Sequence, residues 1–405
     1  MRYGGTPFFV SQPGDITQVD GDFSNQKADG TLADVPGQTE PITAAKSRIL
    51  LVSAVFPLPK MKYPQEKYDE WLKNYLITVT TDVYLYTTPE MGPQFQTLRK
   101  SGLKITVDTT YTTPFEIPPL KGKEELYLRI QKKDRERGRR SNMTENYAVR
   151  NSKAFFLDSA VRTLKAKGEN YEFAFWNDAA SFRNPEHQYR DWPSSGRLQE
   201  VWEEGSQLTG TAKEDLVFVP VFDAPHTTMS FWSENMGPID NKFSEGSFFG
   251  GTPAAIDWFA RTFYAYHDHY LSLEIFIGKD ISLINTLFFL FPEHFITVWH
   301  NDPDAPAHLA LHRTDPEDSF LGQCGSAWHY YQFWLSDTST KEAMRDLWIR
   351  NATRWRLWGW WRSVDKTRCQ DTRVLGVVDV LKRQLGAGWR APGRMVNVPD
   401  KLNWT

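Results

Sequence analysis

Three short apolar runs separated by two helical segments constrain the fold of this chain more than any other feature. The runs cover residues 49–56, 82–87 and 103–107, and the segments between them, 65–76 and 93–100, are predicted to be helices. Short continuous apolar runs are the form taken by strands that are buried on both faces. Their alternation with helices predicts an α/β fold with a doubly wound, mostly parallel sheet and helices on both faces.

The alternation continues along the chain, with a predicted helix at 145–164, strands at 171–176 and 216–222, helices at 252–271 and 281–290, and a strand at 295–299. Residues 1–46 are rich in Gly, Pro, Asp, Gln and Thr, so we expect a flexible leader. We expect one nucleotide-sugar-binding and catalytic domain over 47–322. A helical, aromatic-rich C-terminal extension, 323–405, is expected to pack on it.

The charge and hydropathy of the chain exclude two classes of partner. The net charge of −3 leaves no global basic surface for nucleic acid. The most apolar stretch, 275–299, is interrupted by charged residues and a proline, so we expect no membrane span. No apolar segment follows the first residues, and we expect no signal peptide there.

The aromatic content is high, with 16 Trp, 16 Tyr and 26 Phe. Aromatic rings stack on sugar rings, so this excess suits a carbohydrate site, although core packing accounts for most of these residues. Cys324 and Cys369 could form one disulfide or remain two buried thiols. The glycosylation sequons at Asn142, Asn351 and Asn403 slightly favour the secretory pathway or Golgi lumen over the cytoplasm.

The end of the predicted strand 171–176 carries the strongest candidate site. Ligands of open α/β sheets bind outside the carboxyl ends of the strands, and Asp178 follows this strand directly. Its carboxylate could hold a divalent cation or a ribose hydroxyl, and Arg183 could bind phosphates. The alternative is that Asp178 caps the next turn while Arg183 is a surface residue.

Three further segments carry candidate residues. Glu245, Gly250 and Gly251 lie in a glycine-rich segment, predicted to be a turn that feeds the next helix, where the backbone could approach a ligand closely. Asp280 could accept a sugar hydroxyl or act as a base, or could simply cap a helix. His300, at the end of a strand, could ligate a metal beside Asp178, or could be a hydrogen-bonded structural residue.

Five short motifs occur in an order that resembles the HtrL/YibB-like family, which is similar to GT-A glycosyltransferases. The first motif is the opening strand with the segment 68–74 that follows it. The other four are Asn146–Lys153, Phe175–Arg183, Glu245–Gly251 and Gly278–Ile281. The likeness runs from about 47 to about 301. It implies that a nucleotide-sugar donor, a UDP- or GDP-sugar, binds the N-terminal half and that a sugar passes to a glycan or other acceptor.

The resemblance also implies roles for individual residues. Asp178 takes the place of the strand-end aspartate, Lys153 and Arg183 lie near the diphosphate, and Glu245 and Asp280 line the sugar and acceptor side. GT-A enzymes generally carry an Asp-X-Asp pair that binds Mn²⁺ or Mg²⁺. This chain has a single carboxylate there, so an Asn oxygen, His300 or a metal-free arrangement of Lys153 and Arg183 could replace the pair.

Two other functions compete with the transferase. A non-catalytic carbohydrate-binding protein would keep the fold and the glycan site without turnover. A sugar hydrolase would need two carboxylates in one cleft, for which Glu245 and Asp280 are the only candidates. The parallel sheet makes the hydrolase the weakest of the three hypotheses.

Overall fold

The computed structural model describes residues 48–57, 63–99, 101–134, 144–305, 321, 324, 326–356 and 369–402, without the side chains of 351–356. The leader predicted over 1–46 lies outside the described residues, as do the sequon residues Asn142 and Asn403.

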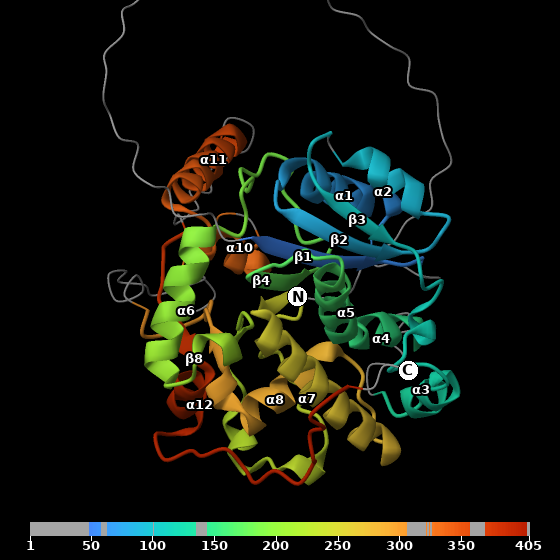
Figure 1. The fold of residues 1–405 in the computed structure, drawn as a ribbon. Coiled ribbons are helices and arrows are strands. Elements are labelled where there is room, and N and C mark those ends of the chain that lie inside the picture. Colours follow the sequence, from blue (N-terminus) through green and yellow to red (C-terminus); the bar gives the residue numbers. More distant parts are fainter. Residues whose placement is uncertain are drawn as a thin grey trace, which may run out of the picture.

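An eight-stranded sheet in the order β3-β2-β1-β4-β6-β5-β7-β8 forms the centre of the described chain (Figure 1). Its strands are β1 (Ile49–Val55), β2 (Asp82–Thr87), β3 (Ile105–Asp108), β4 (Phe173–Asn177), β5 (Val217–Phe218), β6 (Phe248–Gly251), β7 (Phe295–Thr297) and β8 (Leu375–Gly376). Strand β6 is antiparallel to β4 and β5, β8 is antiparallel to β7, and the remaining pairs are parallel. The predicted α/β class with a mostly parallel sheet is confirmed.

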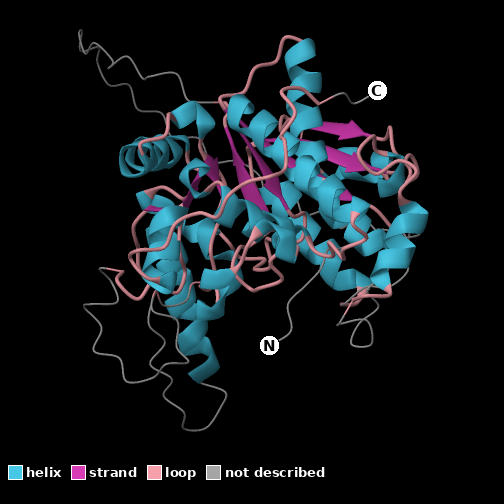
Figure 2. Cartoon of the chain, turned by 90° about the horizontal axis from the view of Figure 1, so that it is seen from below, coloured by secondary structure: helices cyan, strands magenta, loops and turns pink. Residues whose placement is uncertain are grey.

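Helices cover both faces of this sheet (Figures 1 and 2). On one face, α5 (Lys153–Ala166) packs on β1 and β4, and α7 (Pro253–Ser272) packs on β4, β5 and β6. On the other face lie α1 (Gln65–Thr78) and α6 (Ser195–Thr209), whose Trp202 ring contacts Phe173 and Phe175 of β4. Successive strand residues point to opposite faces, so Trp176 turns toward α5 instead.

Seven other helices are described. They are α2 (Gly92–Leu98), α3 (Glu124–Gln131), α4 (Thr144–Asn151), α8 (Asp280–Leu290), α10 (Tyr330–Trp334), α11 (Thr338–Arg356) and α12 (Val377–Leu385), with 3-10 turns at Pro114–Glu116, Lys213–Asp215, Thr227–Phe231, Glu234–Met236, Pro292–His294 and Ala327–His329. The start of α7 follows the sequence prediction, because Thr252 Oγ1 accepts a hydrogen bond from Ala255 N and Pro253 occupies the first turn.

The structure differs from the sequence prediction at five places. The single helix predicted over 145–164 is two helices, α4 and α5, separated at Ser152. Helices α3 and α6 were not predicted. The segment predicted to be a turn before α7 is strand β6, which enters the sheet between β4 and β5. The C-terminal extension is not only helical, since it also adds the edge strand β8.

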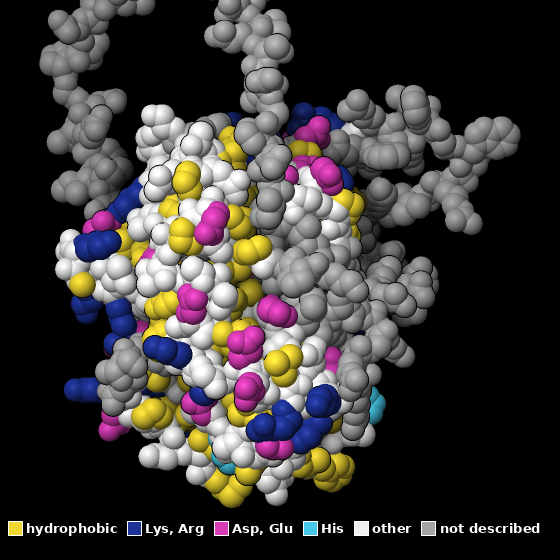
Figure 3. All heavy atoms as spheres, turned by 90° about the vertical axis from the view of Figure 1, so that its right-hand side faces the viewer, with side chains coloured by type: hydrophobic (Ala, Val, Ile, Leu, Met, Phe, Trp, Pro, Cys, Tyr) yellow, Lys and Arg dark blue, Asp and Glu magenta, His cyan; other side chains and the backbone are white. Residues whose placement is uncertain are grey.

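Three further predictions concern the whole chain. Cys324 and Cys369 form a disulfide, so the two-thiol alternative is wrong. Among the described residues, no helix combines the length and apolarity needed to cross a membrane. On the face shown in Figure 3, basic and acidic side chains are interspersed, in keeping with the small net charge of −3.

Candidate functional site

Asp178 lies immediately beyond the carboxyl end of β4, where the sequence placed it. Its backbone N donates to Ser247 O at 2.8 Å, and Trp176 Nε1 donates to its Oδ1 at 2.7 Å. The side chain keeps 20% of its surface exposed. Burial raises the pKa of Asp178, whereas the nearby Lys153 ammonium opposes that shift.

Lys153 is buried in the centre of a cluster that we call the Lys153 cluster: Lys153, Asp178, Asp280 and the carbonyl of Gly246. Its Nζ lies 3.0 Å from Asp178 Oδ1, 2.8 Å from Asp280 Oδ2 and 2.8 Å from Gly246 O. The Trp176 ring adds a cation–π contact at 5.6 Å. Burial opposes the charge on Lys153, but the two carboxylates outweigh burial and raise its pKa. The lysine is therefore a fixed internal cation rather than a solvated helix residue.

Asp280 is the first residue of α8 and completes this cluster. Its side chain is 3% exposed, and Arg150 Nη1 approaches its other oxygen at 4.0 Å. The loop can come this close only because residue 246 is glycine. A Cβ at Gly246 would lie 2.8 Å from Asp280 Oδ2 and 2.8 Å from a methyl carbon of Ile281. Asp280 is thus a buried carboxylate whose charge is balanced by Lys153 at 2.8 Å and by Arg150 at 4.0 Å.

Glu245 lies one residue before Gly246 but faces a different space. Its backbone N donates to Pro220 O at 2.8 Å, and its Oε1 accepts from Ser247 N at 2.9 Å. The side chain is 2% exposed, and Oε2 has no hydrogen-bond partner. Burial raises the pKa of Glu245 well above its ordinary value of 4.5.

A small hollow, which we call the Glu245 hollow, opens beside this carboxyl group. It is lined by Pro220, Val221, Phe222, Glu245, Val298, His300, Ala327, Trp328, Tyr330 and Tyr331. The half-buried rings of Phe222 and Trp328 lie 4.8 Å apart at its wall. The free space of the hollow is about 10 Å³, enough for about one water molecule. Aromatic faces and a carboxyl group are the groups that contact sugar rings and their hydroxyls, so a sugar ring would bind here only if the walls moved apart.

His300 lines the Glu245 hollow, whereas Asp178 is not among the described residues that line it. Its ring stacks on Phe222 at 5.2 Å, and its Nδ1 lies 2.9 Å from Asn301 Oδ1. Burial lowers its pKa to about 4, with the Asn301 bond opposing. The ring is therefore neutral near pH 7. The predicted sharing of a metal by Asp178 and His300 finds no support in this arrangement.

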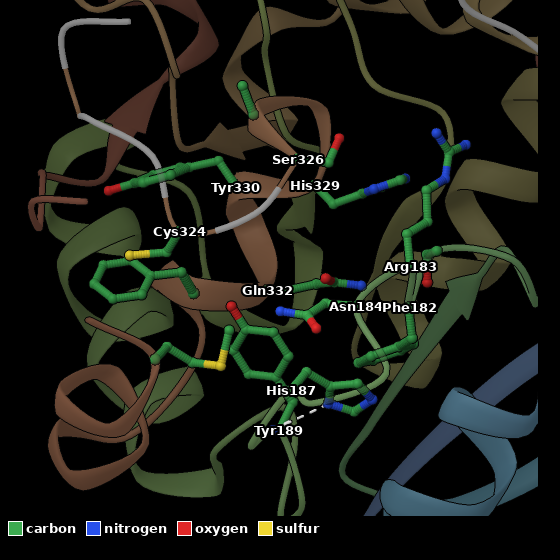
Figure 4. Close-up of a pocket in the computed structure, with 14 residues that line it drawn as sticks. Phe182, Arg183, Asn184, His187, Tyr189, Cys324, Ser326, His329, Tyr330 and Gln332 are labelled. Carbon is green, nitrogen blue, oxygen red and sulfur yellow. Dashed lines mark hydrogen bonds between the residues drawn. The ribbon is translucent and has the colours of Figure 1, made fainter. Parts of the chain in front are cut away.

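Arg183 lines a different space from the Lys153 cluster, although the family resemblance implied that both cations lie near one diphosphate. Its guanidinium lies 4.7 Å from the Trp71 ring centre and 5.9 Å from the Tyr63 ring centre. It lines a second hollow between the chain after β4 and the C-terminal extension (Figure 4). Arg183 therefore serves a different space from Lys153.

The glycine-rich turn predicted at Gly250 and Gly251 is wrong, because both residues are paired within the sheet. A Cβ at Gly250 would lie 2.1 Å from Ala174 O, and one at Gly251 would lie 2.6 Å from Leu216 O. These glycines permit the close approach of β6 to its neighbouring strands. Their backbone faces protein, so we do not include them in a phosphate site.

The residues brought together do not fit a divalent cation. Among the described residues, no group of three or more His, Cys, Asp or Glu side chains is arranged to hold a metal. The oxygens that face one another, from Asp178, Asp280 and Gly246, already surround the Lys153 ammonium. A second cation at this position would be repelled by that charge.

Sequence reasoning missed residues that position or line the site. Asn285 Oδ1 accepts from Ser244 N and Oγ at 3.0 and 2.7 Å, and thereby positions the chain just before Glu245. Trp328, Tyr331 and Gln332 come from the C-terminal extension, whose only recognisable feature in the sequence was its aromatic content. The aromatic run 328–334 was the one available signal.

Comparison with known proteins finds likeness only among solved structures, one of which is described here. No protein-family model matches the sequence, and no curated protein matches it. The chain is similar to the crystal structure of core-mannan synthase A from Aspergillus fumigatus in its Mn/GDP form, with 13% identity and a TM-score of 0.36. The match covers 65% of this chain and 75% of that one. This likeness is too remote to carry a functional argument, and the function must be argued from the site.

Proposed function

We propose that this protein is a glycosyltransferase that moves a sugar from a nucleotide-sugar donor to an acceptor hydroxyl, with Glu245 as the general base. The observation that carries the proposal is the buried Glu245 carboxyl, whose Oε2 has no partner and which lines a hollow walled by Phe222 and Trp328. The proposal also rests on the motifs that resemble the HtrL/YibB-like family.

The raised pKa of Glu245 is the property that a base of this kind needs. Burial raises the pKa of Glu245, and a carboxylate with a raised pKa is a stronger base toward a sugar hydroxyl than an exposed glutamate. In the transfer step, the acceptor O–H gives its proton to Glu245 Oε2 while its oxygen bonds to the anomeric carbon. The bond from that carbon to the diphosphate oxygen breaks, and the nucleoside diphosphate leaves.

The exposed part of Asp178 is proposed to orient the donor. One fifth of its side-chain surface is exposed at the carboxyl end of β4, and the ion pair with Lys153 holds the carboxylate in place. In this position Asp178 accepts hydrogen bonds from ribose or sugar hydroxyls. No step is assigned to a metal, because Lys153 fills the space between the carboxylates.

The Lys153 cluster also favours a second candidate, a carbohydrate-binding protein without turnover. Both of its carboxylates are neutralised by cations from the protein, so neither needs a ligand to complete it. In that case Phe222 and Trp328 would bind a glycan, and Glu245 would only hydrogen-bond to it.

The Glu245→Gln variant separates the two functions. Release of UDP or GDP from a panel of nucleotide sugars is measured with acceptor glycans, together with the glycan-dependent rise in Tm. A transferase should lose about 10²- to 10⁴-fold in kcat in E245Q while keeping its glycan-dependent rise in Tm. Glu200→Gln, an exposed change on α6, is the control and should release nucleotide at the wild-type rate. Equal release by wild type and E245Q would contradict the assigned base, and glycan binding without any release would establish the second function.

The compartment is proposed on chemical grounds. Disulfides persist in oxidising compartments, so the Cys324–Cys369 bond supports a secretory or Golgi location. Labelling of free thiols in protein isolated under alkylating conditions tests this, and two reactive thiols in the native chain would contradict it.

A further inference from the structure

A second hollow lies between the chain that follows β4 and the first part of the C-terminal extension (Figure 4). It is lined by Ser181, Phe182, Arg183, Asn184, His187, Tyr189, Cys324, Ser326, Ala327, His329, Tyr330, Gln332, Phe333 and Met344. We call it the Arg183 hollow. Ala327 and Tyr330 also line the Glu245 hollow, so the two spaces share a wall.

Two buried polar groups in the Arg183 hollow have no partner. Gln332 Nε2 and His329 Nδ1 make no hydrogen bond, although both side chains are only 6% exposed. A buried polar atom left without a partner is energetically unfavourable, because it has lost its hydrogen bonds to water. Both groups lie on the wall of one hollow, so a single polar ligand there would satisfy both.

Arg183 supplies a charge to the same hollow. Its guanidinium lies over the Trp71 ring, 4.7 Å from the ring centre, and its Nε makes only a long 3.5 Å contact to Ala180 O. Within the described part of the chain, no carboxylate forms an ion pair with Arg183, and no lining residue is acidic. Burial, and then the charge of Arg183, lowers the pKa of His329 well below its ordinary value, so the ring stays neutral. The hollow thus has one unbalanced positive charge and several hydrogen-bonding groups.

We propose that the Arg183 hollow binds an oxyanion group, a phosphate or a carboxylate, through the Arg183 guanidinium and the Gln332 amide. A cation would be repelled by Arg183, and an oxyanion offers the acceptors that Arg183 and Gln332 lack. Phe182, Phe333 and Met344 pack against the carbon skeleton that carries this group. The inference goes beyond the proposed transfer, which uses no residue of this hollow as base or orienting group.

The test measures Tm of the full chain with sodium phosphate or pyrophosphate against sodium chloride of equal ionic strength. A ligand that binds only the folded protein raises Tm, so we expect a rise specific to the oxyanion. R183Q and Q332L should each weaken the binding of the oxyanion by about tenfold or more. R183K keeps the charge but loses the planar, bidentate geometry of the guanidinium. Its affinity for the oxyanion should therefore lie between the affinities of these two variants and that of wild type.

Arg345→Gln is the matched control, because Arg345 also stacks on an aromatic ring, Phe333, at 5.0 Å but donates to Cys369 O. R345Q should keep the full rise in Tm. E245Q should keep it as well, which separates this binding site from the proposed transferase chemistry. The proposal is overturned if wild type shows no rise beyond sodium chloride, or if R183Q with an unchanged Tm in sodium chloride keeps the whole rise.

Two further ligands identify the source of the oxyanion. GDP and UDP represent the diphosphate of a donor, and glucuronate and glucose 6-phosphate represent an acidic acceptor sugar. Loss of nucleotide binding in R183Q would place the donor diphosphate in this hollow. Loss of acidic-sugar binding with nucleotide binding intact would make it an acceptor subsite, and either result supports the oxyanion site.

Discussion

Gly246 of the Lys153 cluster and Glu245 of the Glu245 hollow are consecutive residues, yet the buried polar groups at the two places differ in whether the protein supplies their partners. At Gly246 the backbone turns toward Lys153, where two carboxylates and a carbonyl surround one ammonium. At Glu245 a carboxyl oxygen is buried with no partner. Groups that are satisfied within the protein hold the fold together, whereas groups left unsatisfied at a hollow are available to a ligand.

The largest expected effect comes from removing the cation of the closed cluster. Lys153→Met leaves Asp178 and Asp280 buried without their shared counter-charge, and unfolding by urea should show a loss of about 3–5 kcal/mol. Lys67→Met, which breaks the exposed Lys67–Glu70 pair, is the control and should lose at most about 1 kcal/mol. If the two variants lose equally, the cluster does not stabilise the fold in this way.

A smaller effect is expected from crowding the same cluster. Gly246→Ala places a Cβ 2.8 Å from Asp280 Oδ2, so the loop or the carboxylate must move, at a cost of about 1–3 kcal/mol. Gly196→Ala in α6 is the matched control, because no atom lies within 4 Å of its Cβ position. That change should be neutral or stabilise by up to about 1 kcal/mol. A G246A protein as stable as wild type would show that the loop is not held against Asp280.

The unsatisfied carboxyl of Glu245 predicts that the free energy of unfolding depends on pH. The pKa of Glu245 is raised in the folded protein, so its contribution to stability is present below the ordinary value of 4.5 and is lost as pH rises through the folded value. Over that pH range the free energy of unfolding of E245Q should rise relative to that of wild type by up to about 1.4 kcal/mol per pH unit. Unfolding in urea from pH 4 to pH 8 measures the difference, and a difference that does not change with pH would show that folding does not raise the pKa of Glu245.

The smallest effect is expected at Gln332. Replacing a buried amide whose nitrogen has no partner should change stability by less than about 1 kcal/mol in Gln332→Leu. Asn285→Leu is the contrasting change, because that amide donates to Ile239 O and Asn241 O and accepts from Ser244, and it should lose about 2 kcal/mol or more. A larger loss in Q332L than in N285L, measured by urea unfolding, would mean that Gln332 holds the fold rather than a ligand.

Much of the fold could be predicted from the sequence because its signals are local. The apolar runs of β1, β2 and β4 and the Thr252-Pro253 start of α7 each depend on neighbouring residues alone. Strand β6 could not be recognised in this way, since Gly250 and Gly251 carry no strand pattern. They suit a strand only because the backbones of β4 and β5 come so close on either side.

The candidate site was likewise predictable only in the parts that depend on neighbouring residues. By itself the sequence determined that Asp178 ends a buried strand and that Lys153, Glu245 and Asp280 belong to ordered segments of one α/β domain. Only the tertiary structure decided that Lys153 is enclosed by two carboxylates, that Arg183 serves another hollow, and that residues near 330 complete both hollows. The reason is physical: a charge's state depends on which distant groups are packed around it, and chain neighbours do not specify that packing.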